Sequence, residues 1–171
     1  TYMLSGVVEH GDSLGNSGSI GGGDVQWMTA GSGIVHQEMP QAGDEPLRGF
    51  QLWINLPAAD KMCPPLYRDI TAAEIPEISP RSGQRLLVIA GEIAGTRGPV
   101  GAHTVDPVYL DVTLEPGVSF ELETPPEHTA FAYAIAGSGV VGESSQDGLT
   151  TGRLALLGPG ELVHAVAGNH G

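Results

Sequence analysis

The chain has little of what several large classes of protein require. Its 171 residues include one cysteine, Cys63, so an intramolecular disulfide is excluded, and this fits a reducing compartment. Only 7 Lys and Arg stand against 20 Asp and Glu, and the net charge of −13 repels phosphate backbones. No apolar run approaches the roughly 18 residues of a membrane span. We therefore expect a cytoplasmic protein that binds neither nucleic acid directly nor membrane.

Common catalytic and targeting motifs are also missing. No GxSxG motif is present, and the Gly-rich stretch DSLGNSGSIGGG lacks the GK[ST] of a phosphate-binding loop. We expect no nucleophilic role for Cys63, which lies in a proline-rich stretch. The chain opens without a charged leader and without Met, as if inside a strand. We therefore expect no signal peptide, and we interpret the chain as a fragment or a processed product.

Glycine and proline are abundant instead. The chain holds 26 glycines and 13 prolines, which is roughly double the average usage and excludes long helices. Hydrophobic residues make up 40% of the chain, enough for a packed core. Together these features predict an all-β fold with many short strands and turns.

Strand patterns divide the chain into two blocks. In the first block, residues 1–56, we expect strands over Tyr2–Val8, Val25–Met28, Ile34–Glu38 and Phe50–Leu56. Turn-forming residues separate these runs. No helix long enough for a parallel crossover lies between them, so a doubly wound parallel sheet is excluded.

The second block of strand patterns covers residues 83–171. Between the blocks, residues 57–82 are rich in proline and charge, and we interpret them as an ordered interdomain linker. Its one helical feature is a single turn that begins at Thr71, where Glu74 completes a capping box. The spacing of strand starts in the second block, about 10–16 residues, is typical of a sandwich or barrel.

The pair His36 and Glu38 is the most informative local pattern. Residues i and i+2 of a strand point to the same face, so an imidazole and a carboxylate lie side by side. Such a mixed nitrogen and oxygen set suits Fe, Mn, Ni or Cu. The turn at Gly31 and Gly33 just before the pair favours a strand that enters the mouth of a barrel. Two polar side chains that simply face water remain the alternative.

Longer stretches around this pair resemble the pirin family. They are GGGDVQWMTAGSGIVHQEMP, RGFQLWINLP, DKMCPPLYRDI and VYLDVTLEPG. The resemblance implies two cupin-type β-barrels, a bicupin, with one iron ion in the N-terminal barrel and a C-terminal barrel without metal. It also implies that this chain is short at both ends relative to the family. Some pirins resemble quercetinases, which open flavonol rings with dioxygen, and an animal branch acts as an iron-dependent transcriptional co-regulator.

The resemblance implies a metal site of three histidines and one glutamate. Two of these ligands map onto His36 and Glu38, and the family's other two form an HxH pair that would lie upstream of Thr1. The implied cofactor is Fe(II), with other divalent metals as alternatives. Glu38 would serve as a ligand and as proton acceptor from a flavonol-like substrate that reacts with dioxygen. A non-catalytic, iron-dependent regulatory or partner-binding protein is the alternative, as is an inactive fragment with half of the site.

The other histidines are not expected to bind metal. We place His10 in a solvent-facing loop, with the mouth of the pocket as the alternative. His128 lies where the second barrel would carry ligands, but its neighbours form no HxH…E set, so we expect that barrel to be free of metal. His103, His164 and His170 are interpreted as structural or surface residues.

Overall fold

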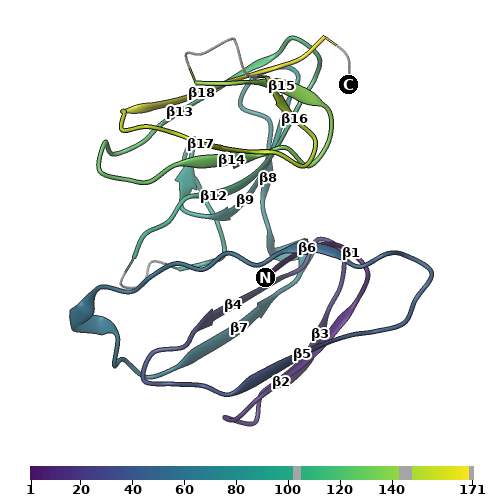
Figure 1. Ribbon diagram of the computed structural model, residues 1–171, viewed down its shortest axis with the longest axis vertical. Helices are drawn as coiled ribbons and strands as arrows, with labels where there is room; N and C mark the ends of the chain where they lie inside the picture. The colour runs from purple at the N-terminus through teal and green to yellow at the C-terminus, as the bar shows by residue number, and fades with distance from the viewer. Residues whose placement is uncertain (102–104, 143–147, 170–171) are drawn as a thin grey trace. The chain divides into compact units, whose positions relative to one another are not determined.

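The computed structural model describes residues 1–101, 105–142 and 148–169, which form two compact units (Figure 1). The first unit comprises Thr1–Glu77 and Leu87–Asp111, and the second comprises Ile78–Leu86 and Val112–Gly171. The division therefore falls within three strands, β8, β9 and β12, whose bounds are given below.

The described residues form strands and two single 3-10 turns, with no α-helix among them, so the all-β prediction is confirmed. The strands that begin and end in the first unit are β1 (Tyr2–Ser5), β2 (Val8–Asp12), β3 (Ser17–Ile20), β4 (Val25–Thr29), β5 (His36–Pro40), β6 (Arg48–Phe50), β7 (Leu66–Ile70), β10 (Glu92–Ile93) and β11 (Thr96–Arg97). The 3-10 turns are η1 (Ala58–Asp60) and η2 (Ala72–Glu74). The remaining strands are β8 (Glu77–Ile78), β9 (Gln84–Ala90), β12 (Tyr109–Leu114), β13 (Ser119–Glu123), β14 (Phe131–Tyr133), β15 (Ser138–Val141), β16 (Leu149–Thr150), β17 (Leu154–Leu156) and β18 (Leu162–Ala167).

Besides the short β10-β11 pair and the sheet β12-β9-β8, which the division crosses, the first unit holds two antiparallel sheets. The larger has the strand order β6-β1-β4-β7, and the smaller has the order β3-β2-β5. In the larger sheet, Val25 pairs with Ile70, and both side chains are fully buried against Ile75, Ile89 and their neighbours in an apolar core. Because side chains alternate along a strand, residues 26 and 69 face the other way, towards the smaller sheet.

The space between the two sheets is partly apolar and partly polar. Met3, Val8 and Ile20 bring β1, β2 and β3 together in a second buried cluster. Two residues further along β2, His10 is buried among polar side chains rather than apolar ones. The interior of this unit thus holds hydrogen-bonding groups that the hydrophobic pattern alone does not account for.

Two strand predictions are corrected by the structure. The expected strand Tyr2–Val8 is divided into β1 and β2, because Gly6 takes a φ of 78° between them. The expected strand Phe50–Leu56 contributes only Phe50 to β6. In the pairing of β1 with β6, Tyr2 lies opposite Phe50, the last residue of β6.

The segment interpreted as a linker, residues 57–82, contributes a strand to the first unit. Leu66–Ile70 forms β7, which pairs with β4 over five residues. The capping box is confirmed: the Thr71 backbone N–H donates to the Glu74 carboxylate (2.8 Å), and so does the Thr71 hydroxyl (3.0 Å). The two units thus do not divide at the expected boundaries, because burial of Ile70 ties β7 to the first unit.

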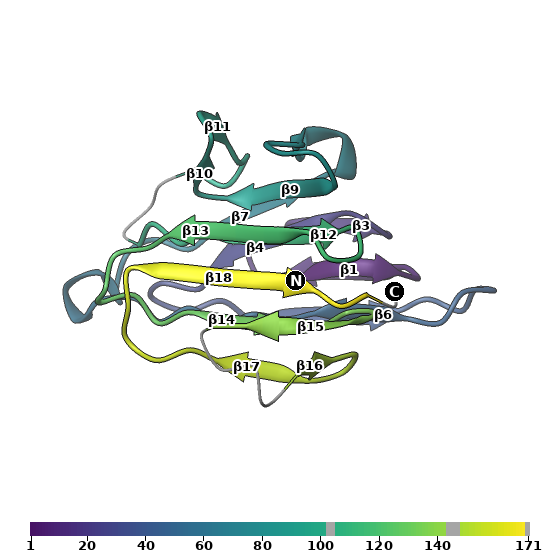
Figure 2. The ribbon, with the colours of Figure 1, turned by 90° about the horizontal axis from the view of Figure 1, so that it is seen from above.

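The second unit is also antiparallel. Its main sheet has the order β13-β18-β15-β16, and β14 pairs with β17 in a separate ribbon (Figure 2). Strands β13 and β18 pair over five residues, from Ser119 opposite Val166 to Glu123 opposite Leu162. Phe120 is buried at the second position of β13.

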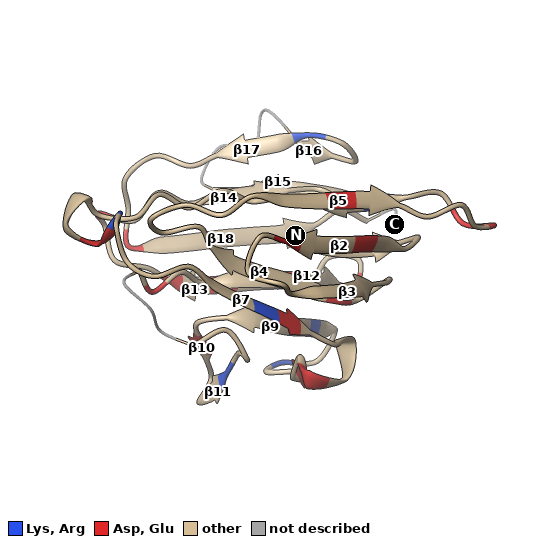
Figure 3. Cartoon of the chain, turned by 90° about the horizontal axis from the view of Figure 1, so that it is seen from below, with Lys and Arg blue, Asp and Glu red and all other residues tan. Residues whose placement is uncertain are grey.

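Charge is distributed as the composition indicates. Acidic residues are spread along the chain and outnumber basic ones (Figure 3). Within the part of the chain that the structure describes, no helix is both long enough and apolar enough to cross a membrane.

Candidate metal centre

Strand β5 carries both predicted metal ligands. It begins at His36 directly after a turn in which Gly31 and Gly33 take φ values of 53° and 131°. A side chain at Gly31 would overlap the carbonyl oxygen of Cys63, so glycine is required there. His36 is exposed and Glu38 is half-buried, and the strand period places them on one face.

The carboxylate of Glu38 lies at the junction of three chain segments. Its Oε1 accepts a hydrogen bond from the Thr1 hydroxyl (3.1 Å), and its Oε2 accepts one from Gln51 Nε2 (3.2 Å). Trp53 Nε1 donates to Gln51 Oε1 (3.2 Å), which orients the amide so that its nitrogen faces Glu38. The carboxylate is therefore held in one orientation from both sides.

Strand β2 faces this pair. In the β2–β5 ladder, Asp12 lies opposite His36 and His10 lies opposite Glu38. The Asp12 carboxylate bonds to the turn that follows β2. It accepts hydrogen bonds from the backbone N–H groups of Leu14 and Asn16 and from the Asn16 side-chain amide. Burial acts to raise the pKa of Asp12, but these hydrogen bonds outweigh it and lower the pKa. Among the described residues, no group of three or more His, Cys, Asp and Glu side chains could hold a metal ion.

The prediction of a solvent-facing loop for His10 is wrong. His10 lies in β2 and is 6% exposed, with Nε2 3.0 Å from Asp69 Oδ2. The Tyr67 hydroxyl contacts both ring nitrogens of His10 and donates to Asp69 Oδ1 (3.0 Å), and Gln26 Nε2 donates to the Tyr67 hydroxyl (2.6 Å). Burial raises the pKa of Tyr67, and the hydrogen bond and charge of Asp69 raise it further.

The local signal for His10 was available in the sequence. Val8 and His10 share one face of β2, and Glu9 between them is exposed, so the pattern is that of a strand with one buried face. What the sequence did not reveal is the partner, because Asp69 is 59 residues away and lies in the segment interpreted as a linker.

The other candidate residues lie apart from this site. His128 is exposed, and its backbone N–H donates to the Pro125 carbonyl (3.0 Å) in a turn between β13 and β14. His164 is half-buried in β18, opposite Glu121 of β13. Cys63 is a half-buried free thiol. His103 and His170 lie outside the described residues.

Known proteins resemble the chain along nearly its whole length. The Pirin family model matches residues 1–54, and the model of the Pirin C-terminal cupin domain matches residues 109–170. Pirin-1 of Arabidopsis thaliana is 43% identical over 164 residues, which are 95% of this chain and 56% of that protein. The chain therefore spans about half the length of the curated relatives it matches.

Two solved structures share the fold. The quercetin 2,3-dioxygenase of Acinetobacter baumannii superposes with a TM-score of 0.82 at 32% identity, covering 99% of this chain and 60% of that one. GK1651 of Geobacillus kaustophilus superposes with a TM-score of 0.81 at 31% identity, and the match covers 98% of this chain and 73% of that one. The predicted bicupin β fold is thereby confirmed, and the chain belongs to the pirin family.

Proposed function

We propose that His36 and Glu38 are two of the ligands of a divalent metal ion, Fe(II) in the first instance, in a pirin that opens the ring of a flavonol-like substrate with dioxygen. The observation that carries this proposal is the His36–Glu38 pair on one face of β5. The Thr1 and Gln51 side chains hold the Glu38 carboxylate in place by hydrogen bonds. The quercetin 2,3-dioxygenase of A. baumannii, which shares the fold, supports the substrate class.

The donor set fits such an ion. An imidazole nitrogen and a carboxylate oxygen on one strand face suit Fe(II), Mn(II), Ni(II) or Cu(II) better than Ca²⁺ or Mg²⁺. Thr1 contacts Glu38, so in a full-length pirin the residues that precede Thr1 would enter the unit beside this carboxylate. That is where the family's HxH pair would complete the set. A bound ion of this kind supplies Lewis acidity to substrate oxygens and open positions for dioxygen.

The chain's own residues would contribute binding, orientation and a proton acceptor. Gln51 and Thr1 fix the two oxygens of Glu38, and a carboxylate held in this way can accept the proton of a flavonol hydroxyl.

Metal analysis and oxygen uptake test the proposal. The full-length protein would be dialysed against a chelator, loaded anaerobically with Fe(II), and assayed for oxygen consumption with quercetin. His36→Ala should lose bound iron and quercetin-dependent oxygen uptake. The matched control is Gln37→Ala, which changes the exposed neighbour on the opposite face of β5 and should leave both unchanged.

The outcomes separate the alternatives. Equal iron content in His36→Ala and wild type would refute the metal site. Iron that depends on His36, without oxygen uptake on any flavonol tried, would refute the oxygenase and favour the non-catalytic regulatory alternative. Residues 1–171 alone should hold less than one iron per chain, because the described part of the chain offers no third ligand beside the pair.

A further inference from the structure

We propose that His10 is a positioning residue for the metal-binding strand, acting through a buried polar cluster that fixes β2, and with it β5, against β7. This inference rests on the proposed function for its link to metal binding. The polar cluster comprises His10 of β2, Gln26 of β4, and Tyr67 and Asp69 of β7.

The polar cluster joins the two sheets of the first unit. His10 belongs to the smaller sheet, and the other three residues belong to the larger one. Asp69 holds His10 at 3.0 Å through one carboxylate oxygen and accepts from Tyr67 at 3.0 Å through the other. The side chain of His10 is only 2% exposed, so the hydrogen bonds form where water does not compete for them. No buried side-chain nitrogen or oxygen in the described residues lacks a partner.

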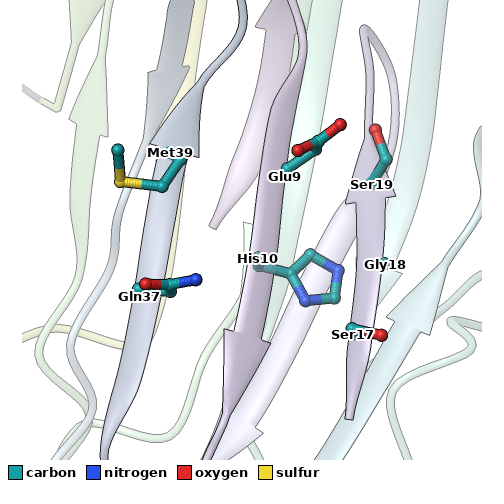
Figure 4. A pocket seen from close by; sticks show the side chains of 7 residues that line it. All are labelled: Glu9, His10, Ser17, Gly18, Ser19, Gln37 and Met39. Atoms are coloured by element: carbon teal, nitrogen blue, oxygen red, sulfur yellow. The ribbon is translucent and has the colours of Figure 1, made fainter.

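A glycine makes room for this contact. Gly18 of β3 pairs with His10 across the β2–β3 ladder, and a Cβ at Gly18 would lie 2.8 Å from both His10 Nε2 and Asp69 Oδ2. Figure 4 shows the His10 ring extending from β2 towards Gly18 at an open pocket of the smaller sheet. The His10–Asp69 pair therefore occupies the volume that a side chain on β3 would fill.

The backbone transmits the position of His10 to the metal ligands. Strand β5 is the outer strand of β3-β2-β5, and it pairs with β2 over five residues in which Glu38 lies directly opposite His10. On its other side, β5 meets the larger sheet through the bonds of Glu38 with Thr1 and Gln51. Displacement of β2 would thus move His36 and Glu38 relative to the donors that hold the carboxylate.

Fe(II) affinity of the full-length protein, measured by anaerobic chelator competition, tests the role in metal binding. His10→Leu should weaken Fe(II) binding about tenfold, in the range found when residues that support metal ligands are lost. His10→Gln, which keeps a donor for Asp69, should retain most of the affinity. The control is Gln84→Leu in the second unit, which removes the hydrogen bond from buried Gln84 to the Ser119 carbonyl (2.7 Å) and should leave the affinity unchanged.

Amide hydrogen exchange of the metal-free protein tests the positioning itself. His10→Leu should raise exchange in peptides that cover His36–Pro40 more than in peptides that cover Val25–Thr29. Asp69→Asn keeps the side-chain shape and removes its charge, so it should raise exchange over His36–Pro40 to a smaller extent. This variant replaces His10→Leu in the test if His10→Leu does not fold.

The results distinguish this inference from the proposed function. Unchanged exchange over β5 in the His10 and Asp69 variants would overturn the inference, as would equal losses of affinity in His10→Leu and Gln84→Leu. Wild-type protein that binds no Fe(II), or binds it independently of His36, would overturn the proposed function, and the exchange result would still decide whether His10 positions β5.

Discussion

Substitution of Gly18 by alanine should destabilise the first unit although it adds only one methyl group. The new Cβ would lie 2.8 Å from Asp69 Oδ2, 2.8 Å from His10 Nε2 and 2.9 Å from His10 Cε1. Distances below 3.0 Å are not tolerated by carbon atoms, so the structure must shift. Because Gly18 and His10 are paired through the β2–β3 backbone, the shift will fall on the His10–Asp69 contact.

The magnitude follows from what that contact provides. A hydrogen bond to a charged group contributes about 1.5–3 kcal/mol, and His10 would lose its contact with Asp69 while the Tyr67 hydroxyl stays beside its ring. The Asp69 side chain is about one-third exposed, so water can replace part of the hydrogen bond that Asp69 loses. The lower half of the range of about 1.5–3 kcal/mol for such a bond therefore applies. Alanine loses less conformational entropy than glycine when a strand forms, and this offsets roughly 0.5 kcal/mol of the destabilisation. We expect Gly18→Ala to reduce the free energy of unfolding of the first unit by about 1–2 kcal/mol.

Tryptophan fluorescence in a urea titration measures this change. Both tryptophans of the chain, Trp27 and Trp53, lie in the first unit, so their emission reports on that unit rather than on the second. The free energy is obtained from the midpoint and slope of this transition alone, because two compact units need not unfold in one step.

The matched control is Gly11→Ala on the neighbouring strand. A Cβ there would meet the Asn16 carbonyl oxygen at 3.7 Å and Gln37 Nε2 at 3.9 Å, which are ordinary contacts. Its effect should stay within about 0.5 kcal/mol. Equal stabilities for Gly18→Ala and Gly11→Ala would refute the reasoning. In an Asp69→Ala background, Gly18→Ala should cost about 1 kcal/mol less, because one of the two obstructing side chains has gone.

Three further changes have defined outcomes. Burial, with the charge of Asp111, raises the pKa of Tyr109 to about 12, so the neutral phenol stabilises the fold below pH 10 and that stability is lost as the pH rises towards 12. Tyr109→Phe should flatten this loss in unfolding curves measured across that range. Hydrogen bonds from the Thr71 backbone and hydroxyl lower the pKa of Glu74, so the stability they give is present above pH 4.5 and lost in acid. Glu74→Ala should therefore weaken the fold at pH 7 more than at pH 3 in thermal melts. His128→Ala should leave the iron content of the full-length protein unchanged by metal analysis, and a loss would contradict a metal-free second cupin domain.

The parts of the fold that depend on local rules were predictable from the sequence. Glycine and proline content indicated short strands, and the Thr71–Glu74 spacing identified a capping box that the structure confirms. Strand pairing is not local, and there the predictions failed. The pairing of β1 with β6 places Tyr2 opposite Phe50, and no local pattern gives a register between segments so far apart in the sequence. A strand needs a neighbour as well as a suitable composition.

Candidate site residues divide in the same way. His36 and Glu38 were found because two residues of one strand share a face whatever their surroundings, and their role as ligands stays a prediction. The environment of His10 depends on a contact with Asp69, 59 residues away, and on the absence of a side chain at Gly18. The alternation of Val8, Glu9 and His10 indicates a strand with one buried face, but neither Asp69 nor Gly18 can be identified as a neighbour of His10 from spacing within that segment.

The arrangement of polar contacts in the first unit gives His10 and Glu38 complementary roles. Their strands are adjacent and the two residues are directly opposite, yet their side chains bind different parts of the larger sheet: His10 binds β7, and Glu38 binds Thr1 and Gln51 near β1 and β6. The β2–β5 ribbon is thus attached to the larger sheet by polar contacts at two separated places, in addition to the apolar cluster of Met3, Val8 and Ile20. Contacts at separated places fix the angle of a ribbon as well as its position. In the proposed site Glu38 would present a carboxylate oxygen to the metal ion, and the His10 cluster would help to keep that oxygen in place without touching the ion.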